Sequence, residues 1–166
     1  MKVGLKIDPE YYGPIKGTLN VLLPDEIEIY KAAEAKNFDI IVDTRLDTNN
    51  GIKVTSRVIG NFNSSKKVND SIVDKEILNS NYDQNDFKKR CRFRLKLSIY
   101  RLLCHYLDLK MNPWGILIGV RPTKLGHILL DQGMSYQQIE QQLEEVYGVQ
   151  ENKRELLINI VRRERK

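Results

Sequence analysis

The sequence predicts an α+β protein, with a small, mainly antiparallel sheet and a covering helix followed by an all-helical carboxy-terminal half. Two observations carry this prediction. Apolar and polar side chains alternate in four early segments, which is the period of a half-buried strand, at residues 2–7, 26–30, 38–46 and 52–62. From residue 87 onward, apolar side chains recur at steps of three and four, the period of an amphipathic helix. We therefore predict an α+β subdomain at 1–85 and a helical subdomain at 86–166.

The early segments are expected to follow the order β-α-β-β-β. The helix is predicted between residues 11 and 23, where Gly13-Pro14 could begin it and Pro24 would end it. Asn50-Gly51 predicts a hairpin turn between the last two strands, because Asn-Gly adopts positive φ at low cost. Residues 60–86 are polar and rich in asparagine. They predict a mobile connection, with a short strand around 68–73 as the less favoured alternative.

The helical subdomain begins with the longest helical pattern in the chain, residues 87–110. Asp86 is its predicted cap, and Asn112-Pro113 ends the pattern. Three shorter helices are predicted at 122–131, 136–147 and 151–164. Ser135, followed three residues later by Gln138, has the spacing of a capping box at the start of the second of these.

Composition places the chain among ordinary folded proteins. Its 166 residues carry a net charge of +5, divided as −3 over residues 1–50 and +8 over residues 51–166. We find no apolar run long enough for a membrane helix and no signal-peptide pattern, so we expect a cytoplasmic protein that does not contact membranes. Cys91 and Cys104 are thirteen positions apart on one predicted helix, about 20 Å, which is too far for a disulfide.

The residue types that carry catalysis and bind metals show no functional spacing. Cys91 and Cys104 fall on or beside the apolar stripe, where cysteine acts as a small hydrophobe. The two histidines, His105 and His127, belong to no zinc-binding pattern. His105 adjoins Cys104, but consecutive helical residues do not face each other, which disfavours a catalytic pair. We therefore expect no catalytic and no metal-binding residue in this chain.

Seven cations crowd the long predicted helix, at Lys88, Lys89, Arg90, Arg92, Arg94, Lys96 and Arg101. Helical geometry spreads them over two flanks, which favours a solvated margin around the core stripe. A nucleic-acid surface would place them on one face with interleaved aromatic residues, whereas Phe93 and Tyr100 are the aromatics in this stretch. Nucleic acid is therefore an unlikely partner, although a nucleic-acid-binding helical module remains the alternative function.

Residues 112–124, Asn-Pro-Trp-Gly-Ile-Leu-Ile-Gly-Val-Arg-Pro-Thr-Lys, combine the most conformational restriction with the most chemistry. Pro122 suits the first turn of a helix, whose free amides and dipole attract anions. Arg121 and Lys124 flank that point, so a carboxylate or phosphate could bind there. Alternatively, the segment is a tight turn in which Arg121 pairs with an internal carboxylate such as Asp131 or Glu145. Trp114 is expected to anchor a core or an interface.

The segment from Pro113 to Lys124 resembles a P-W-G-x-L-x-G-[VI]-R-P-T-K stretch of the oxygen-independent coproporphyrinogen III oxidase-like proteins, which belong to the radical S-adenosylmethionine class. The resemblance is specific over about residues 110–150. It implies a site or interdomain role for Trp114, Gly115, Gly119, Arg121, Pro122, Thr123 and Lys124. It also implies a longer parent oxidoreductase of porphyrin and heme biosynthesis, with a carboxy-terminal catalytic barrel that would be this region's partner.

In that family, three cysteines spaced C-x3-C-x2-C hold a [4Fe–4S] cluster that cleaves S-adenosylmethionine. This chain has two cysteines and lacks the triplet, so the resemblance implies these cofactors for the parent and none for this region. We accordingly expect a non-catalytic amino-terminal region that docks on the barrel or helps to position the anionic porphyrinogen.

Overall fold

The computed structural model describes residues 1–33, 37–61, 71–76 and 84–165. The chain forms two compact units, Met1–Lys110 and Met111–Lys166. The first unit is α+β and the second is entirely helical in its regular structure, which confirms the predicted fold class.

The first unit is built on a five-stranded sheet with the order β2-β1-β3-β4-β5. Its strands are β1 (Lys2–Lys6), β2 (Glu28–Lys31), β3 (Ile40–Asp47), β4 (Ile52–Asn61) and β5 (Ser71–Glu76). The pairs β3–β4 and β4–β5 are antiparallel and form the longer ladders, whereas β1 pairs in parallel with both β2 and β3. Parallel pairing of β1 and β2 is possible because the helix between them returns the chain to the same edge.

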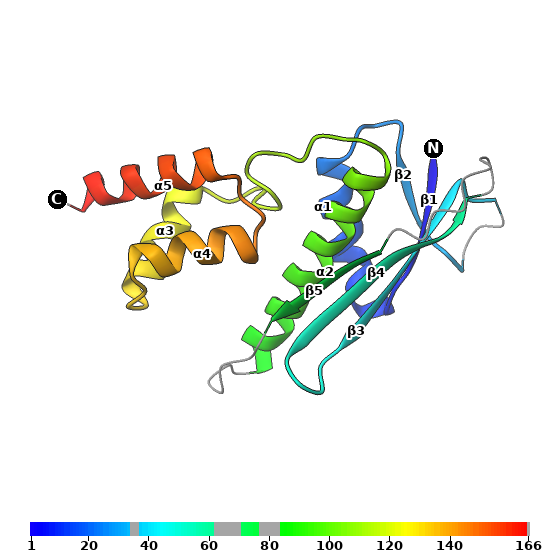
Figure 1. The fold of residues 1–166 in the computed structure, drawn as a ribbon, viewed down its shortest axis with the longest axis horizontal. Coiled ribbons are helices and arrows are strands. Elements are labelled where there is room, and N and C mark those ends of the chain that lie inside the picture. The colour runs from blue at the N-terminus through cyan, green and yellow to red at the C-terminus, as the bar shows by residue number, and fades with distance from the viewer. Residues whose placement is uncertain (34–36, 62–70, 77–83, 166) are drawn as a thin grey trace. The chain divides into compact units, whose positions relative to one another are not determined.

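Two helices, α1 (Pro9–Leu22) and α2 (Gln84–Tyr106), pack on one face of this sheet (Figure 1). Their buried apolar residues meet strand residues such as Val3, Val42 and Val54, all fully buried. A chain of buried hydroxyls crosses the same layer. Thr44 donates to Ser56 at 3.1 Å, and the Ser56 and Ser98 hydroxyl oxygens are 2.9 Å apart. These hydroxyls therefore satisfy one another where α2 crosses β4.

The helix α1 begins earlier than the sequence pattern indicated. Asp8 caps it by accepting a hydrogen bond from the Glu10 amide at 2.9 Å, and Pro9 occupies the first turn. Pro14 lies inside the helix instead of at its start. The expected start at Gly13-Pro14 was therefore wrong, because Asp8-Pro9, five residues earlier, supplies both a cap and a first-turn proline.

Two further differences concern the middle of the chain. The expectation of a structureless connection over 60–86 was wrong in part, because Ser71–Glu76 forms strand β5; the rest of 62–83 lies outside the described residues. The helix α2 packs on β3, β4 and β5, so the compact units divide after Lys110 and not at the predicted 85/86 boundary. It also begins at Gln84, which places the predicted cap Asp86 in its first turn.

The second unit contains α3 (Pro122–Asp131), α4 (Tyr136–Glu145) and α5 (Glu151–Glu164). The capping box of Ser135 and Gln138 is confirmed, with both reciprocal hydrogen bonds present. The helices α3 and α5 approach closely at Gly126, where an added Cβ would lie 2.8 Å from a methyl group of Val161. Residues 112–121 therefore come directly before a tightly packed group of three helices in the chain.

Candidate functional site

The stretch that the sequence singled out forms a compact turn followed by the start of α3. Asn112 organises the turn. Its carbonyl accepts from the Gly115 amide at 2.8 Å, and its side-chain oxygen accepts from the Trp114 amide at 2.9 Å. The Leu117 amide in turn donates to the Trp114 carbonyl at 3.1 Å. The backbone of the Pro-Trp-Gly segment is thereby held by its own hydrogen bonds.

Two backbone hydrogen bonds attach this turn to the segment between α4 and α5. The Ile116 amide donates to the Tyr147 carbonyl, and the Gln150 amide donates to the Pro113 carbonyl, each at 2.9 Å. Gly115 has a φ of +58°. A Cβ at this position would lie 1.9 Å from the Tyr147 carbonyl oxygen, so the close approach requires glycine. The turn is therefore a fixed part of the second unit.

The start of α3 presents the cations that the sequence predicted. Arg121 is the residue before the helix, and its side chain makes no capping hydrogen bond; Pro122 occupies the first turn. Both Arg121 and Lys124 are exposed, while Pro122 and Thr123 are half-buried. Among the described residues, the two cationic side chains have no ion pair, so they are available to an anion at the amino end of the helix.

The alternative in which Arg121 pairs with Asp131 does not hold, because Asp131 pairs with Arg165. Arg165 also donates to the backbone carbonyl of His127 at 3.1 Å. The other named candidate, Glu145, accepts a hydrogen bond from Gln141 at 2.9 Å. The arginine at the start of α3 therefore stays exposed.

Two further residues of the stretch are Gly119, where only the backbone conformation favours glycine, and Trp114, whose side chain is half-buried. Gly119 has a φ of +69° but open space where a side chain would be, so only its backbone conformation favours glycine. Trp114 is half-buried, and the Lys153 ammonium lies 5.7 Å from the centre of its ring. Trp114 is thus partly exposed to solvent and does not belong to the closed core.

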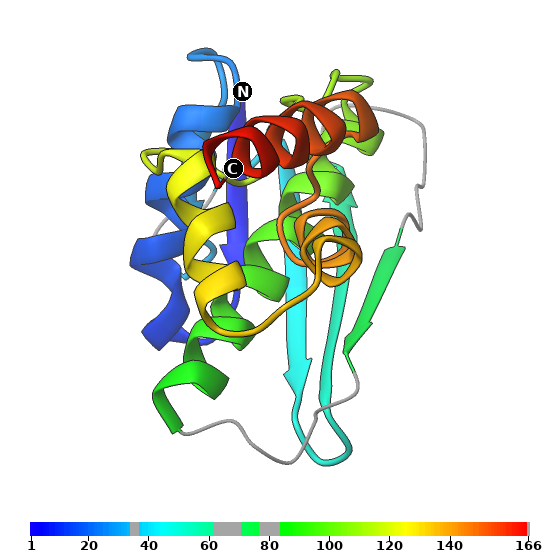
Figure 2. The same cartoon turned by 90° about the vertical axis from the view of Figure 1, so that its left-hand side faces the viewer.

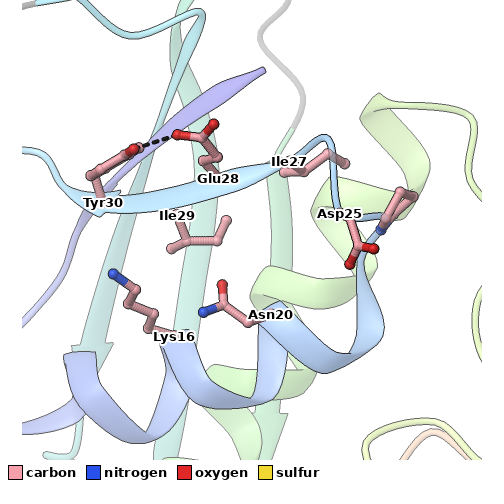
Figure 3. A pocket seen from close by; sticks show the side chains of 8 residues that line it. Lys16, Asn20, Asp25, Ile27, Glu28, Ile29 and Tyr30 are labelled. Atoms are coloured by element: carbon pink, nitrogen blue, oxygen red, sulfur yellow. Dashed lines mark hydrogen bonds between the residues drawn. The ribbon is translucent and has the colours of Figure 1, made fainter.

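A groove in the first unit has no counterpart in the sequence analysis. It has a volume of about 330 Å³ and lies between α1 and the edge strand β2 (Figure 3). Lys16 and Asn20 extend from α1 toward it, and Ile29 points down from the strand. Tyr30 donates to the Glu28 carboxylate, and this hydrogen bond raises the pKa of the phenol. No spacing signals the groove, because α1 and β2 form it only after folding.

The cations of α2 occupy different environments, and the expected solvated margin is wrong for Arg94, which is buried. Lys88 pairs with Glu10 at 3.1 Å, and the Lys89 ammonium lies 6.0 Å from the Phe93 ring centre. Burial lowers the pKa of Lys96, and nearby Arg92 adds to this effect. These residues therefore do not form one exposed cationic face.

The two cysteines do not resemble reactive or ligating thiols. Cys91 and Cys104 are both buried in α2, and burial raises the pKa of the Cys104 thiol. No group of three or more candidate metal ligands occurs within the described residues. Two buried thiols on one helix do not fit an iron–sulfur cluster, so we derive no reaction step through one. In the same part of the chain, no helix has both the length and the apolar character to cross a bilayer.

Comparison with known proteins finds one partial similarity. The chain is 45% identical over 51 residues to the oxygen-independent coproporphyrinogen-III oxidase-like protein HemZ of Bacillus subtilis (strain 168). Those residues are 31% of this chain and 10% of that protein, so the match spans about a tenth of the curated relative's length. No protein-family model and no solved structure matches the chain. The similarity supports a relationship with coproporphyrinogen oxidase-like proteins.

Proposed function

We propose that this chain is a non-catalytic amino-terminal region of an oxygen-independent coproporphyrinogen III oxidase-like enzyme of the radical S-adenosylmethionine class. The observation that carries the proposal is the Pro-Trp-Gly…Arg-Pro-Thr-Lys stretch, together with the partial identity to HemZ. The catalytic barrel, its [4Fe–4S] cluster and S-adenosylmethionine belong to the rest of the parent enzyme. The cytoplasm is the proposed location.

The role that we propose for residues 114–124 is to bind an anionic group, either on the barrel or on the porphyrinogen. The fixed turn at Gly115 sets the position of the segment, and the exposed pair Arg121 and Lys124 supplies the charge. Arginine offers a planar fork that suits carboxylates, and the free amides at the start of α3 add donors. The half-buried Trp114 supplies apolar area in the same stretch of sequence.

The first experiment sequences the full reading frame that encodes this chain. We expect a downstream C-x3-C-x2-C triplet, and its absence from the full reading frame would contradict the proposal. The 166-residue chain is then treated with iron and sulfide under anaerobic conditions. Cluster absorbance or cleavage of S-adenosylmethionine by this chain alone would show that it is catalytic.

A second experiment tests the role of the cations in the full-length enzyme. The variant Arg121→Gln/Lys124→Gln should weaken porphyrinogen binding or dissociate the chain from a separately expressed barrel. The matched control is Arg163→Gln/Lys110→Gln, which removes two exposed charges elsewhere. If both variants behave like the wild type in binding and in association, residues 121 and 124 have no such role.

A further inference from the structure

Within the described residues of the first unit, the sheet has one face that neither α1 nor α2 covers. Both α1 and α2 pack on the opposite face, as Figure 2 shows from the helical side. Strand side chains alternate between the faces, and β4 illustrates the pattern, since Val54, Ser56 and Val58 are buried while Lys53, Arg57 and Ile59 are exposed. The uncovered face is therefore where the outward residues of β1, β3, β4 and β5 gather.

A buried carboxylate organises the cations of this face. The Asp43 side chain is only 4% exposed, although it lies on the face opposite to α1 and α2. Arg57 donates to one Asp43 oxygen through Nε at 3.2 Å and Nη2 at 3.0 Å. Arg45 Nε lies 3.5 Å from the same oxygen, and Lys6 Nζ lies 4.0 Å from the other. Three cations thus converge on a single carboxylate and leave an excess of positive charge.

These three cations gather around Asp43 and remain accessible. The side chains of Lys6, Arg45 and Arg57 are 63%, 71% and 48% exposed. Because Asp43 engages Arg57 through Nε and Nη2, the remaining Nη1 of that guanidinium has no partner among the described residues. Hydrogen bonds fix the direction of Arg57, and all three side chains present N–H donors to solvent that phosphate oxygens can accept.

The strand register continues the positive charge along the sheet. Lys6, Asp43 and Arg57 lie side by side on adjacent strands, and Arg45 lies one outward position further along β3. The next outward position on β3 is Asp47, which pairs with Lys53 of β4, and Lys53 pairs in turn with Lys75 of β5. Successive outward positions on a strand are roughly 6.7 Å apart. We define the cationic face as Lys6, Arg45, Lys53, Arg57 and Lys75.

Among the described residues, the carboxylates within the cationic face are those of Asp43 and Asp47. The Asp47 carboxylate accepts from the Asn49 amide at 3.0 Å, which directs it to the hairpin turn. Five cations against two carboxylates leave a net charge of +3. The cationic face therefore combines regular spacing with an uncompensated charge.

We propose that the cationic face binds the phosphodiester backbone of a single-stranded nucleic acid. The charge complements a chain of monoanions, and because no aromatic side chain interleaves the five cations, the contacts are with phosphates and not with stacked bases. A protein partner is less favoured, because protein interfaces are poor in lysine and have an apolar centre. Here three of the five cations are lysines, and the exposed apolar residues, Ile59 and Val73, are separate from each other. This surface is different from the α2 cations and from residues 114–124.

The test measures binding of fluorescent poly(U) to the 166-residue chain over a range of salt concentrations. If all five cations contact phosphates, the logarithm of the affinity falls with the logarithm of the salt concentration with a slope of about 3.5, at about 0.7 per contact. The variant Lys53→Gln/Lys75→Gln leaves the Asp43 cluster intact and should reduce that slope by about 1.4. Arg45→Gln should reduce it further.

The matched control is Lys89→Gln/Arg92→Gln, which removes two exposed charges from α2 and should leave the slope unchanged. Equal losses in both double variants would overturn the proposal, since net charge alone would then explain binding. Absence of salt-sensitive binding would also overturn it and identify the face as ordinary solvated sheet surface. If the chain bound poly-glutamate as tightly as poly(U), the result would contradict the proposal and point to an acidic protein as the partner of this face.

Discussion

Gly115 lies so close to Tyr147 that no side chain fits between them. A Cβ on residue 115 would lie 1.9 Å from the Tyr147 carbonyl oxygen, which also accepts the Ile116 amide. The contact fixes the Pro-Trp-Gly turn against the segment between α4 and α5, and it makes the turn a structural element as well as a candidate binding segment.

The first prediction follows from that contact. Gly115→Ala should destabilise the second unit by more than about 3 kcal/mol, because strain at positive φ adds to a clash with backbone that cannot move aside. Urea unfolding followed by circular dichroism measures the loss. The matched control is Gly119→Ala, which has a similar φ but open space. It should cost only the strain, about 1–2 kcal/mol; equal losses in the two variants would contradict the clash.

The second prediction concerns the buried hydroxyl chain between the sheet and α2. Ser56 is its middle member, so Ser56→Ala leaves Thr44 and Ser98 without that partner. We expect a loss of about 1–3 kcal/mol in the free energy of unfolding of the first unit. Ser98→Ala removes only the end of the chain and should cost less, because Thr44 still donates to Ser56. The reverse order would show that the hydroxyls are not coupled as described.

The third prediction concerns pH and Lys96. Burial, with nearby Arg92, lowers the pKa of this ammonium below its ordinary value of 10.5. The folded chain therefore binds this proton less tightly than the unfolded chain does, and the charge opposes folding at neutral pH. Lys96→Met should raise the midpoint of thermal unfolding at pH 7, and the gain should shrink as the pH rises toward 10.5. The exposed Lys110→Met is the control for loss of charge. A gain that does not depend on pH would point to packing instead.

The fourth prediction concerns the capping box of α4. Ser135→Ala removes the acceptor for the Gln138 amide, bonded at 3.2 Å, and should cost about 1 kcal/mol of unfolding free energy. The neighbouring exposed Gln137→Ala keeps the cap and should change stability little. Chemical denaturation of both variants measures the difference. Equal stabilities would mean that the cap contributes nothing to the second unit.

Sequence patterns predicted the elements whose residues carry a periodic or capping signal. Alternation located β1 to β4, Asn50-Gly51 located the hairpin, and Ser135 with Gln138 located the start of α4. A strand in the region of β5 was predicted only as the less favoured alternative, around 68–73, because the surrounding sequence is polar; pairing with β4 supplies the order that composition does not. The sequence placed α2 in the helical subdomain, whereas it packs on the sheet. An apolar stripe shows that a helix is buried on one side but does not specify its partner.

The candidate sites divide in the same way. The exposed cations Arg121 and Lys124 could be predicted, because Pro122 marks the helix start in the sequence itself. The groove between α1 and β2 and the convergence of Lys6, Arg45 and Arg57 on Asp43 depend on strand order and register. The parallel pairing of β1 with β3 is what brings Lys6 beside Asp43. The expected mainly antiparallel sheet did not specify this parallel pair.

Trp114 is the chain's sole indole, and it belongs to the second compact unit. Selective excitation of that chromophore therefore reports melting of residues 111–166 alone, whereas differential scanning calorimetry records heat from both halves. Coincident midpoints would reveal thermodynamic coupling through the junction at Lys110; separate midpoints would mean that the halves melt as independent cooperative blocks.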